Sequence, residues 1–141
     1  MSTNRAPDVE IARLIDRLLR RINGELNADA ARFDRHDVGP HGGMLLLTLA
    51  ELQPARIQDL VSAMARDKSQ MTRAIKSLEA KGLIARAGVE GDGRVSMLSL
   101  TDEGKLTVAA LQQAVAEALM GILSPLSADE HETLKALLAR L

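Results

Sequence analysis

The stretch from Ile57 to Ala80 constrains the fold of this chain more than any other part of the sequence. Apolar residues recur there at helical spacing, which predicts one short amphipathic helix over Ile57–Met64 and another over Lys68–Ala80. Only Ala65, Arg66 and Asp67 separate the two helices, so a tight turn must join them. Asp67, with Gln70 three residues later, has the spacing of a capping box at a helix start.

A two-stranded hairpin is predicted directly after these helices. Leu83–Ala87 and Val95–Leu100 are short runs rich in branched aliphatic residues, and Gly88–Gly93 between them has the composition of a turn. The loop is longer than two residues, so its turn type is left open. The order of elements is that of a helix-turn-helix followed by a β-wing. In that arrangement the first helix braces the second, which leaves one face of the second free to enter a major groove.

Longer helices are predicted on both sides of this segment. Asp8–Phe33 carries an apolar stripe at helical spacing, and another helix is expected over about 40–52. After the hairpin, capping residues open one helix over about 101–123 and a last one from Ser127. Because Phe33 is the only aromatic residue, the core must be aliphatic. The sequence therefore predicts a mainly α-helical chain with a small β-hairpin, and 141 residues suit one domain.

One face of the predicted helix Lys68–Ala80 carries side chains suited to bind DNA. If Met71, Ile75 and Leu78 face the core, the residues near the opposite side are Lys68, Ser69, Gln70, Thr72, Arg73, Lys76 and Ser77. Arginine can form two hydrogen bonds with guanine, glutamine can do so with adenine, and serine or threonine bind bases or phosphates. The same residue types occupy ordinary solvated helix faces, so this helix alone leaves both interpretations open.

The net charge of −1 conceals an uneven distribution of charge. Residues 66–94 contain seven lysines or arginines and four acids, a balance of +3. Residues 101–141 contain three basic residues and six acids, a balance of −3. A positive centre favours an anionic partner for that part of the chain. A chance fluctuation on a solvated surface would give the same numbers.

Several functional classes lack the residues that they require. The chain has no cysteine, which excludes disulfides, thiolate metal sites and cysteine-based sensing. His36, His41 and His131 have no partner at ligand spacing, and the serines and aspartates form no catalytic motif. We therefore expect no metal site, no cofactor, no catalytic residue and no enzymatic activity. No apolar run could span a membrane and no signal peptide is visible, so we expect a cytoplasmic protein.

The chain resembles the MarR family of bacterial transcriptional regulators over the segment RIQDLVSAMARDKSQMTRAIKSLEAKGLIARAGVEGDGRVSMLSLTDEGK. The resemblance rests on four motifs in order: D-K-S-x-x-T-R at the start of the second helix, L-E-x-K-G-L-I at its end, D-x-R in the wing, and L-S-L-T-x-E-G-K before the next helix. Flanking helices of matching length extend it over nearly the whole chain. One departure is Ala65, which replaces a frequent glycine, so we expect the turn to form there without a positive φ.

The resemblance implies a homodimeric repressor that binds duplex DNA. In the family, terminal helices of two chains interlock, and two winged lobes bind a pseudo-palindromic operator. Carried over to this chain, residues 8–36 and 101–141 would be dimerisation helices, and residues 37–100 would be the DNA-binding lobe of a single domain, 1–141. Packing of the terminal helices within one chain is an alternative that stays open.

The resemblance also implies roles for two residues of the wing. In the family, the arginine of the D-x-R motif enters a minor groove, and the aspartate holds it through an ion pair. Here these residues are Arg94 and Asp92. A narrow minor groove concentrates negative potential, which attracts an arginine.

A small-molecule effector is a further function that the resemblance implies. In the family, small aromatic or phenolic anions bind between the dimerisation helices and the DNA-binding lobe. The corresponding region here includes Arg13, Arg17, His41 and Met44, although salt bridges or core packing would also account for these residues. The leading alternative to a DNA-binding regulator is a winged-helix module that uses the same helix face to hold another protein.

Overall fold

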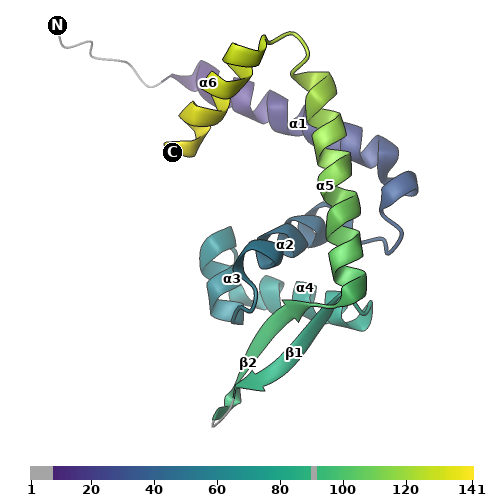
Figure 1. Ribbon diagram of the computed structural model, residues 1–141. Helices are drawn as coiled ribbons and strands as arrows, with labels where there is room; N and C mark the ends of the chain where they lie inside the picture. Colours follow the sequence, from purple (N-terminus) through teal and green to yellow (C-terminus); the bar gives the residue numbers. More distant parts are fainter. Residues whose placement is uncertain (1–7, 90–91) are drawn as a thin grey trace, which may run out of the picture. The chain divides into compact units, whose positions relative to one another are not determined.

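The computed structural model describes residues 8–89 and 92–141, with side chains for residues 8–88 and 96–141. This part of the chain forms six helices and one two-stranded sheet, which Figure 1 labels: α1 (Val9–Phe33), α2 (Gly39–Leu52), α3 (Ile57–Met64), α4 (Lys68–Ala80), β1 (Ile84–Val89), β2 (Asp92–Leu100), α5 (Asp102–Ile122) and α6 (Ala128–Ala139). This architecture confirms the predicted mainly α-helical fold with a small β-hairpin.

Contacts divide the chain into two compact units. The winged unit is Ala30–Gln113, and the terminal unit consists of the segment up to Asp29 together with Ala114–Leu141. Helix α5 contributes residues to both units. The predicted division into dimerisation helices and a DNA-binding lobe concerns function, and it stays a prediction.

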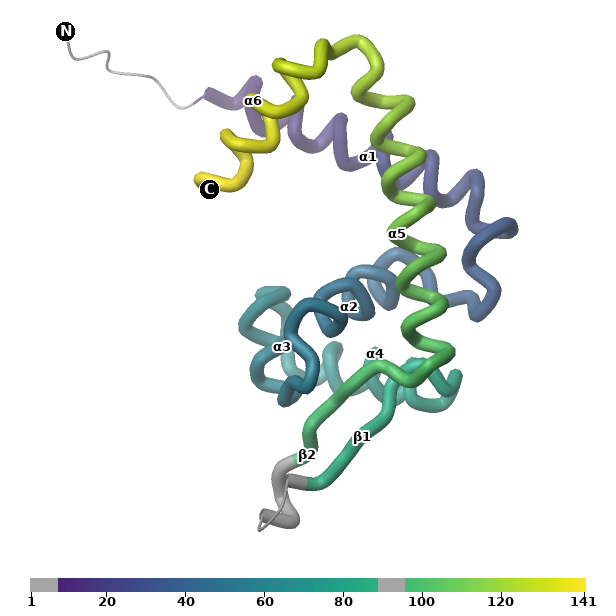
Figure 2. Tube along the Cα trace, in the orientation of Figure 1, coloured from purple at the N-terminus to yellow at the C-terminus, as the bar shows by residue number. Residues whose placement is uncertain are grey.

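The core of the winged unit is aliphatic. Its largest fully buried side chains come from α2, α3, α4 and the hairpin region: Leu45, Leu46, Leu49, Leu60, Met71, Ile75, Leu83 and Leu98. In the chain trace of Figure 2, the three helices gather beside the base of the hairpin. Met71, Ile75 and Leu78 are buried as the apolar stripe predicted, because three- and four-residue spacing places them on one side of α4. Their burial fixes which face of α4 is left in solvent.

The turn between α3 and α4 differs from its prediction. Ala65 ends α3 in the left-handed region, with φ 50° and ψ 42°, so the expectation of a turn without positive φ was wrong. The Ala65 amide donates to the Val61 carbonyl, and the left-handed conformation of Ala65 lets the Arg66 amide donate to the same carbonyl at 3.3 Å, which closes the end of α3. Asp67 caps α4 by accepting from the Ser69 amide at 2.9 Å, in place of the predicted capping box with Gln70.

The strands of the hairpin are longer than predicted. The ladder runs without interruption from the Ile84–Leu100 pair to the Gly88–Ser96 pair, and its register shifts between Gly88 and Val89. Gly88 therefore pairs within β1, and the expectation of a loop over Gly88–Gly93 was wrong. The reason is that glycine can adopt extended backbone whenever a partner strand supplies hydrogen bonds. A short bridge, which the sequence did not reveal, pairs Ala55 with Leu98 on the other side of β2.

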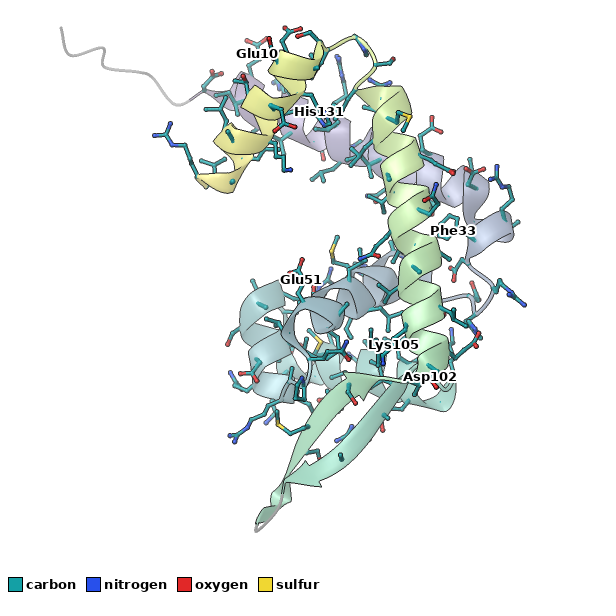
Figure 3. The ribbon with its side chains drawn as sticks, viewed as in Figure 1. Glu10, Phe33, Glu51, Asp102, Lys105 and His131 are labelled. Atoms are coloured by element: carbon teal, nitrogen blue, oxygen red, sulfur yellow. The ribbon has the colours of Figure 1, made fainter. Side chains whose placement is uncertain are left out.

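The start of α5 is joined closely to the end of α4. The Thr101 hydroxyl donates to the Gly82 carbonyl at 2.6 Å and accepts from the Gly104 amide at 2.9 Å. The Thr101 amide donates to the Leu83 carbonyl at 3.1 Å. A Cβ atom on Gly104 would lie 2.1 Å from that carbonyl oxygen, so only glycine fits. Asp102, labelled in Figure 3, lies in the first turn of α5, where an acid interacts favourably with the helix dipole.

The segment that precedes α2 is held by side chains of the winged unit. The Asp34 carboxylate accepts from the Val38 amide at 2.8 Å and from the Gly39 amide at 3.0 Å, which satisfies two donors at the start of α2. His36 Nε2 lies 3.0 Å from Glu103 Oε1 on α5. Lys81 Nζ donates to the Asp37 carbonyl at 2.6 Å. These contacts fix the path of the chain between Phe33 and α2.

The terminal unit buries few of its side chains. No residue of α1 or α6 is buried, although both helices carry apolar residues. The exposed large apolar side chains of this unit are Val9, Ile11, Leu14, Ile15, Leu19, Met120, Leu126, Leu137, Leu138 and Leu141. None of the described helices combines the length and the hydrophobicity that crossing a lipid bilayer requires.

Candidate nucleic-acid interface

The face of α4 opposite its buried stripe is open to solvent. Lys68, Ser69, Gln70, Arg73, Lys76 and Ser77 are exposed, and Thr72 is half-buried. The structure therefore places these seven predicted residues on one helix, away from Met71, Ile75 and Leu78. An open depression on this face is lined by Lys68, Ser69, Thr72 and Arg73. The face offers guanidinium, ammonium, amide and hydroxyl groups to an approaching polyanion.

Local hydrogen bonds involve the side chain of one residue of this face and the backbone of another. The Thr72 hydroxyl donates to the Lys68 carbonyl at 2.8 Å, so its proton is already used and only its lone pairs remain for a ligand. The Ser69 amide donates to the Asp67 carboxylate, which starts the helix at a defined residue. The capping bond therefore sets the residue at which α4 begins, and the exposed face begins with it.

An ion pair links the far end of α4 to the hairpin. Arg86 on β1 donates to Glu79, with Nη2 2.6 Å from Oε1 and Nε 3.4 Å from Oε2. The hydrogen bond to Glu79 raises the pKa of Arg86, and burial acts in the opposite direction. The pair neutralises the single carboxylate of α4, so the charge of Lys68, Arg73 and Lys76 on the same helix is uncompensated by its own residues. Arg86 entered the charge balance of the sequence only as a cation, and its contact with Glu79 was not predicted.

The predicted wing residues lie where their side chains are not described. Asp92 opens β2 opposite Val89, and Arg94 follows two residues later in the same strand. Because the side chains of residues 89–95 lie outside the described part, the ion pair between Asp92 and Arg94 stays a prediction.

The predicted effector region is divided between the two units. Arg13 and Arg17 lie on α1 in the terminal unit, whereas His41 and Met44 lie on α2 in the winged unit. Met44 is exposed, and His41 Nδ1 lies 2.7 Å from Arg66 Nη2. The grouping of these four residues into one site stays a prediction. Among the described residues, no cluster of three potential metal ligands is found.

Comparisons with known proteins place the chain in a family. The MarR family model matches residues 43–96, which covers α4 and most of the hairpin. The chain is 38% identical over 98 residues to the uncharacterized HTH-type transcriptional regulator YxaD of Bacillus subtilis, spanning 70% of this chain and 68% of that protein. It is 31% identical over 137 residues to the HTH-type transcriptional regulator PecS of Dickeya dadantii, spanning 93% of this chain and 75% of PecS.

A solved structure shares the fold. The crystal structure of a MarR mutant from E. coli with operator DNA superposes with a TM-score of 0.78 at 22% identity, covering 94% of this chain and 93% of that one. The likeness agrees with the helix-turn-helix and hairpin described above. The relatives, the family model and the fold together identify the chain as a member of the MarR family of transcriptional regulators.

Proposed function

We propose that this chain is a transcriptional regulator that binds double-stranded DNA with sequence specificity, as a homodimer, and represses transcription. The observation that carries the proposal is the exposed face of α4. That face presents three cations and several hydrogen-bonding groups, while buried Met71, Ile75 and Leu78 anchor the helix from behind. The E. coli MarR mutant of the same fold was crystallised with operator DNA, which supports this use of the fold.

Each side chain of this face has a role that follows from its chemistry. Arg73 and Gln70 would read base edges in the major groove, because their groups form paired hydrogen bonds with guanine and adenine. Lys68 and Lys76 would bind phosphates, and Ser69, Thr72 and Ser77 would fix the register of the helix on the duplex. In the wing, Arg94 would enter the minor groove and Asp92 would position it.

The terminal unit would supply the dimer contact. Helices α1 and α6 bury no side chain within the chain, yet they expose large apolar residues. Such surface gains most from association with a second copy, and isologous dimers are the commonest oligomers. A dimer would present two copies of α4 to the two halves of a pseudo-palindromic operator.

A small-molecule effector would release the operator. We propose a small aromatic or phenolic anion that binds near Arg13, Arg17, His41 and Met44, and we assign no catalytic role to any residue. The proposal rests on the family to which the chain belongs. Screening such anions for loss of operator binding tests this proposal. If no compound reduces operator binding, the effector is contradicted and the regulator acts without one.

Selection of bound duplexes from a random pool tests the DNA-binding function directly. We expect one enriched palindrome whose affinity falls steeply with salt, because cations of α4 displace counterions from phosphates. Weak binding to every duplex, with little dependence on salt, would contradict the proposal. That outcome would favour the alternative, a winged-helix module that holds another protein.

Substitution of Arg73 tests the base-reading role. Arg73→Ala should cost roughly 1–3 kcal/mol of binding to the selected operator and should relax the preference at one base pair. The measurement is competition binding with operators altered at single positions. Lys76→Ala is the matched change, and it should weaken binding to all duplexes about equally. An unchanged preference in Arg73→Ala would show that Arg73 does not read a base.

A further inference from the structure

Arg66 is a cation of the winged unit that the proposed function does not use. It lies in the turn between α3 and α4, directly before the residue that caps α4. Its side chain is half-buried, and it lines one pocket together with His41 of α2 and with Gln70 and Arg73 of α4. Gln70 and Arg73 also belong to the exposed face of α4. The guanidinium of Arg66 therefore lies beside the candidate DNA-binding face.

His41, in the first turn of α2, holds the guanidinium of Arg66. Its Nδ1 atom lies 2.7 Å from Arg66 Nη2. A guanidinium carries no acceptor, so Arg66 donates and the imidazole accepts on an unprotonated Nδ1. This bond uses one N–H donor of the guanidinium and leaves the others for a ligand. His41 therefore restricts the direction of a guanidinium that can still bind an anion.

No carboxylate balances the charge of Arg66. None of the described residues that line the pocket is acidic, and no ion pair within the described part of the chain includes Arg66. The carboxylate of Asp67, the next residue, accepts from the Ser69 amide as the cap of α4. Burial of a charge is unfavourable unless an opposite charge pairs with it. An anion that approaches from solvent would therefore bind Arg66 favourably.

We propose that Arg66 binds a phosphate of the DNA backbone and that His41 is the residue that positions it. This assignment rests on the proposed DNA-binding function and adds two residues outside the seven of α4. In a helix-turn-helix the first helix crosses the DNA backbone and the start of the second enters the groove, so the turn between them passes the phosphates. Because the bond to His41 holds the guanidinium toward α2, we assign Arg66 to a phosphate and not to a base edge. Such a contact sets how deeply α4 enters the groove and reads no sequence.

The salt dependence of DNA binding measures a phosphate contact. Arg66→Gln should weaken binding to the selected duplex and to an unrelated duplex by the same factor, about tenfold for each bound protomer. It should also lower the slope of log Kd against log salt by about 0.9 for each bound protomer. Arg35→Gln removes an exposed guanidinium outside the pocket and is the matched control, which should change neither quantity. An unchanged slope in Arg66→Gln would overturn the phosphate contact, and a loss of preference at one base pair would show that Arg66 reads a base.

Variants of His41 separate positioning from charge. His41→Leu removes the acceptor, and it should weaken binding to both duplexes about threefold and lower the salt slope, because Arg66 is no longer directed at the phosphate. His41→Asn places an acceptor oxygen near the position of Nδ1 and should recover most of this loss. In the Arg66→Gln background the two His41 variants should bind DNA equally, because no guanidinium is left to position. Equal affinities of His41→Leu and His41→Asn in the wild-type background would contradict the positioning role.

The same measurements separate this assignment from the proposed function. If the wild type binds no duplex, the proposed function fails and the phosphate contact fails with it. If the wild type selects a palindrome and Arg66→Gln binds every duplex as the wild type does, only the role of Arg66 is overturned. Thermal melting checks that each variant is folded. If Arg66→Gln does not fold, Arg66→Met keeps an apolar stem in the half-buried position and repeats the test.

Discussion

Ala65 adopts a conformation that glycine would adopt at lower cost. Its φ of 50° and ψ of 42° lie in the left-handed region, which costs an L-residue roughly 1–2 kcal/mol. Glycine removes this cost but loses more backbone entropy on folding, about 0.5–1 kcal/mol. We therefore expect Ala65→Gly to stabilise the protein by about 0.5–1 kcal/mol and to raise Tm in calorimetry. Ala63→Gly, at an exposed helical position of α3, should lower Tm, and the same response from both variants would contradict this account.

Gly104 is fixed by a neighbouring carbonyl. A Cβ atom there would approach the Leu83 oxygen to 2.1 Å, and backbone cannot move aside as a flexible side chain can. Gly104→Ala should therefore destabilise the protein by about 1–3 kcal/mol, although alanine favours helices. Gly121→Ala is the matched change on α5, where a Cβ atom meets nothing within 4 Å, and it should raise Tm slightly. Urea unfolding of both variants measures the difference, and equal stabilities would show that the junction relaxes freely.

The sequence did not reveal the conformation of Ala65 or the role of Gly104, because both depend on how separate segments of backbone meet in the folded chain. Ala65 was expected to keep a negative φ, because the demand for a positive φ arises only once α3 and α4 meet at a tight turn. Gly104 was not singled out, because the Leu83 carbonyl that excludes a Cβ atom there comes from a segment 21 residues away in sequence. By contrast, the buried stripe of α4 was predictable, since periodicity alone determines which residues share a helix face.

At the scale of elements, Glu79 and Arg86 connect helix α4 to the hairpin. Their side chains are about one-third exposed, at 29% and 33%, so the pair adds little to stability. Its consequence is geometric, because two contacts between guanidinium and carboxylate restrict the direction of β1 relative to α4. A hairpin held in this way would bring the wing to a defined distance from the groove that α4 enters.

A charge swap tests this geometric role. Glu79→Gln and Arg86→Gln should each weaken operator binding with little change in Tm, and the double variant Glu79→Arg with Arg86→Glu should recover most of the affinity. The double-mutant cycle should give a coupling of about 0.5–3 kcal/mol in DNA binding. If Arg86 contacts DNA itself, the swap will not rescue binding.

Element boundaries were more predictable for helices than for strands. The predicted bounds of α3 and α4 match those observed, because apolar periodicity and capping residues are encoded locally. The strand ends depend on partners, so the pairing of Gly88 with Ser96 and the bridge of Ala55 to Leu98 could not be read from composition. The positions of the seven side chains on α4 followed from periodicity, whereas the contact of Arg86 with Glu79 required the pairing of the hairpin.

At the scale of the whole molecule, the unburied apolar face of α1 is the strongest sign of a partner. Ile11, Ile15 and Leu19 share one side of the helix, and 52%, 48% and 53% of their surfaces are exposed. A stripe of this kind on a helix with no buried residue would be costly for an isolated chain in water. The acids and bases of α1 lie largely on other sides, so association through the stripe would bury few charges.

Placing a carboxylate in this stripe tests the proposed homodimer. Wild type should sediment at about twice the 15.2 kDa mass of the chain, and Leu19→Glu should shift it toward monomer, because a buried carboxylate without a partner is strongly unfavourable. Arg13→Glu adds the same acid on the opposite side of α1 and should leave the dimer intact. The monomeric variant should also lose operator affinity, since one winged unit reaches only one half-site. A Leu19→Glu variant that stays dimeric would exclude this stripe as the interface.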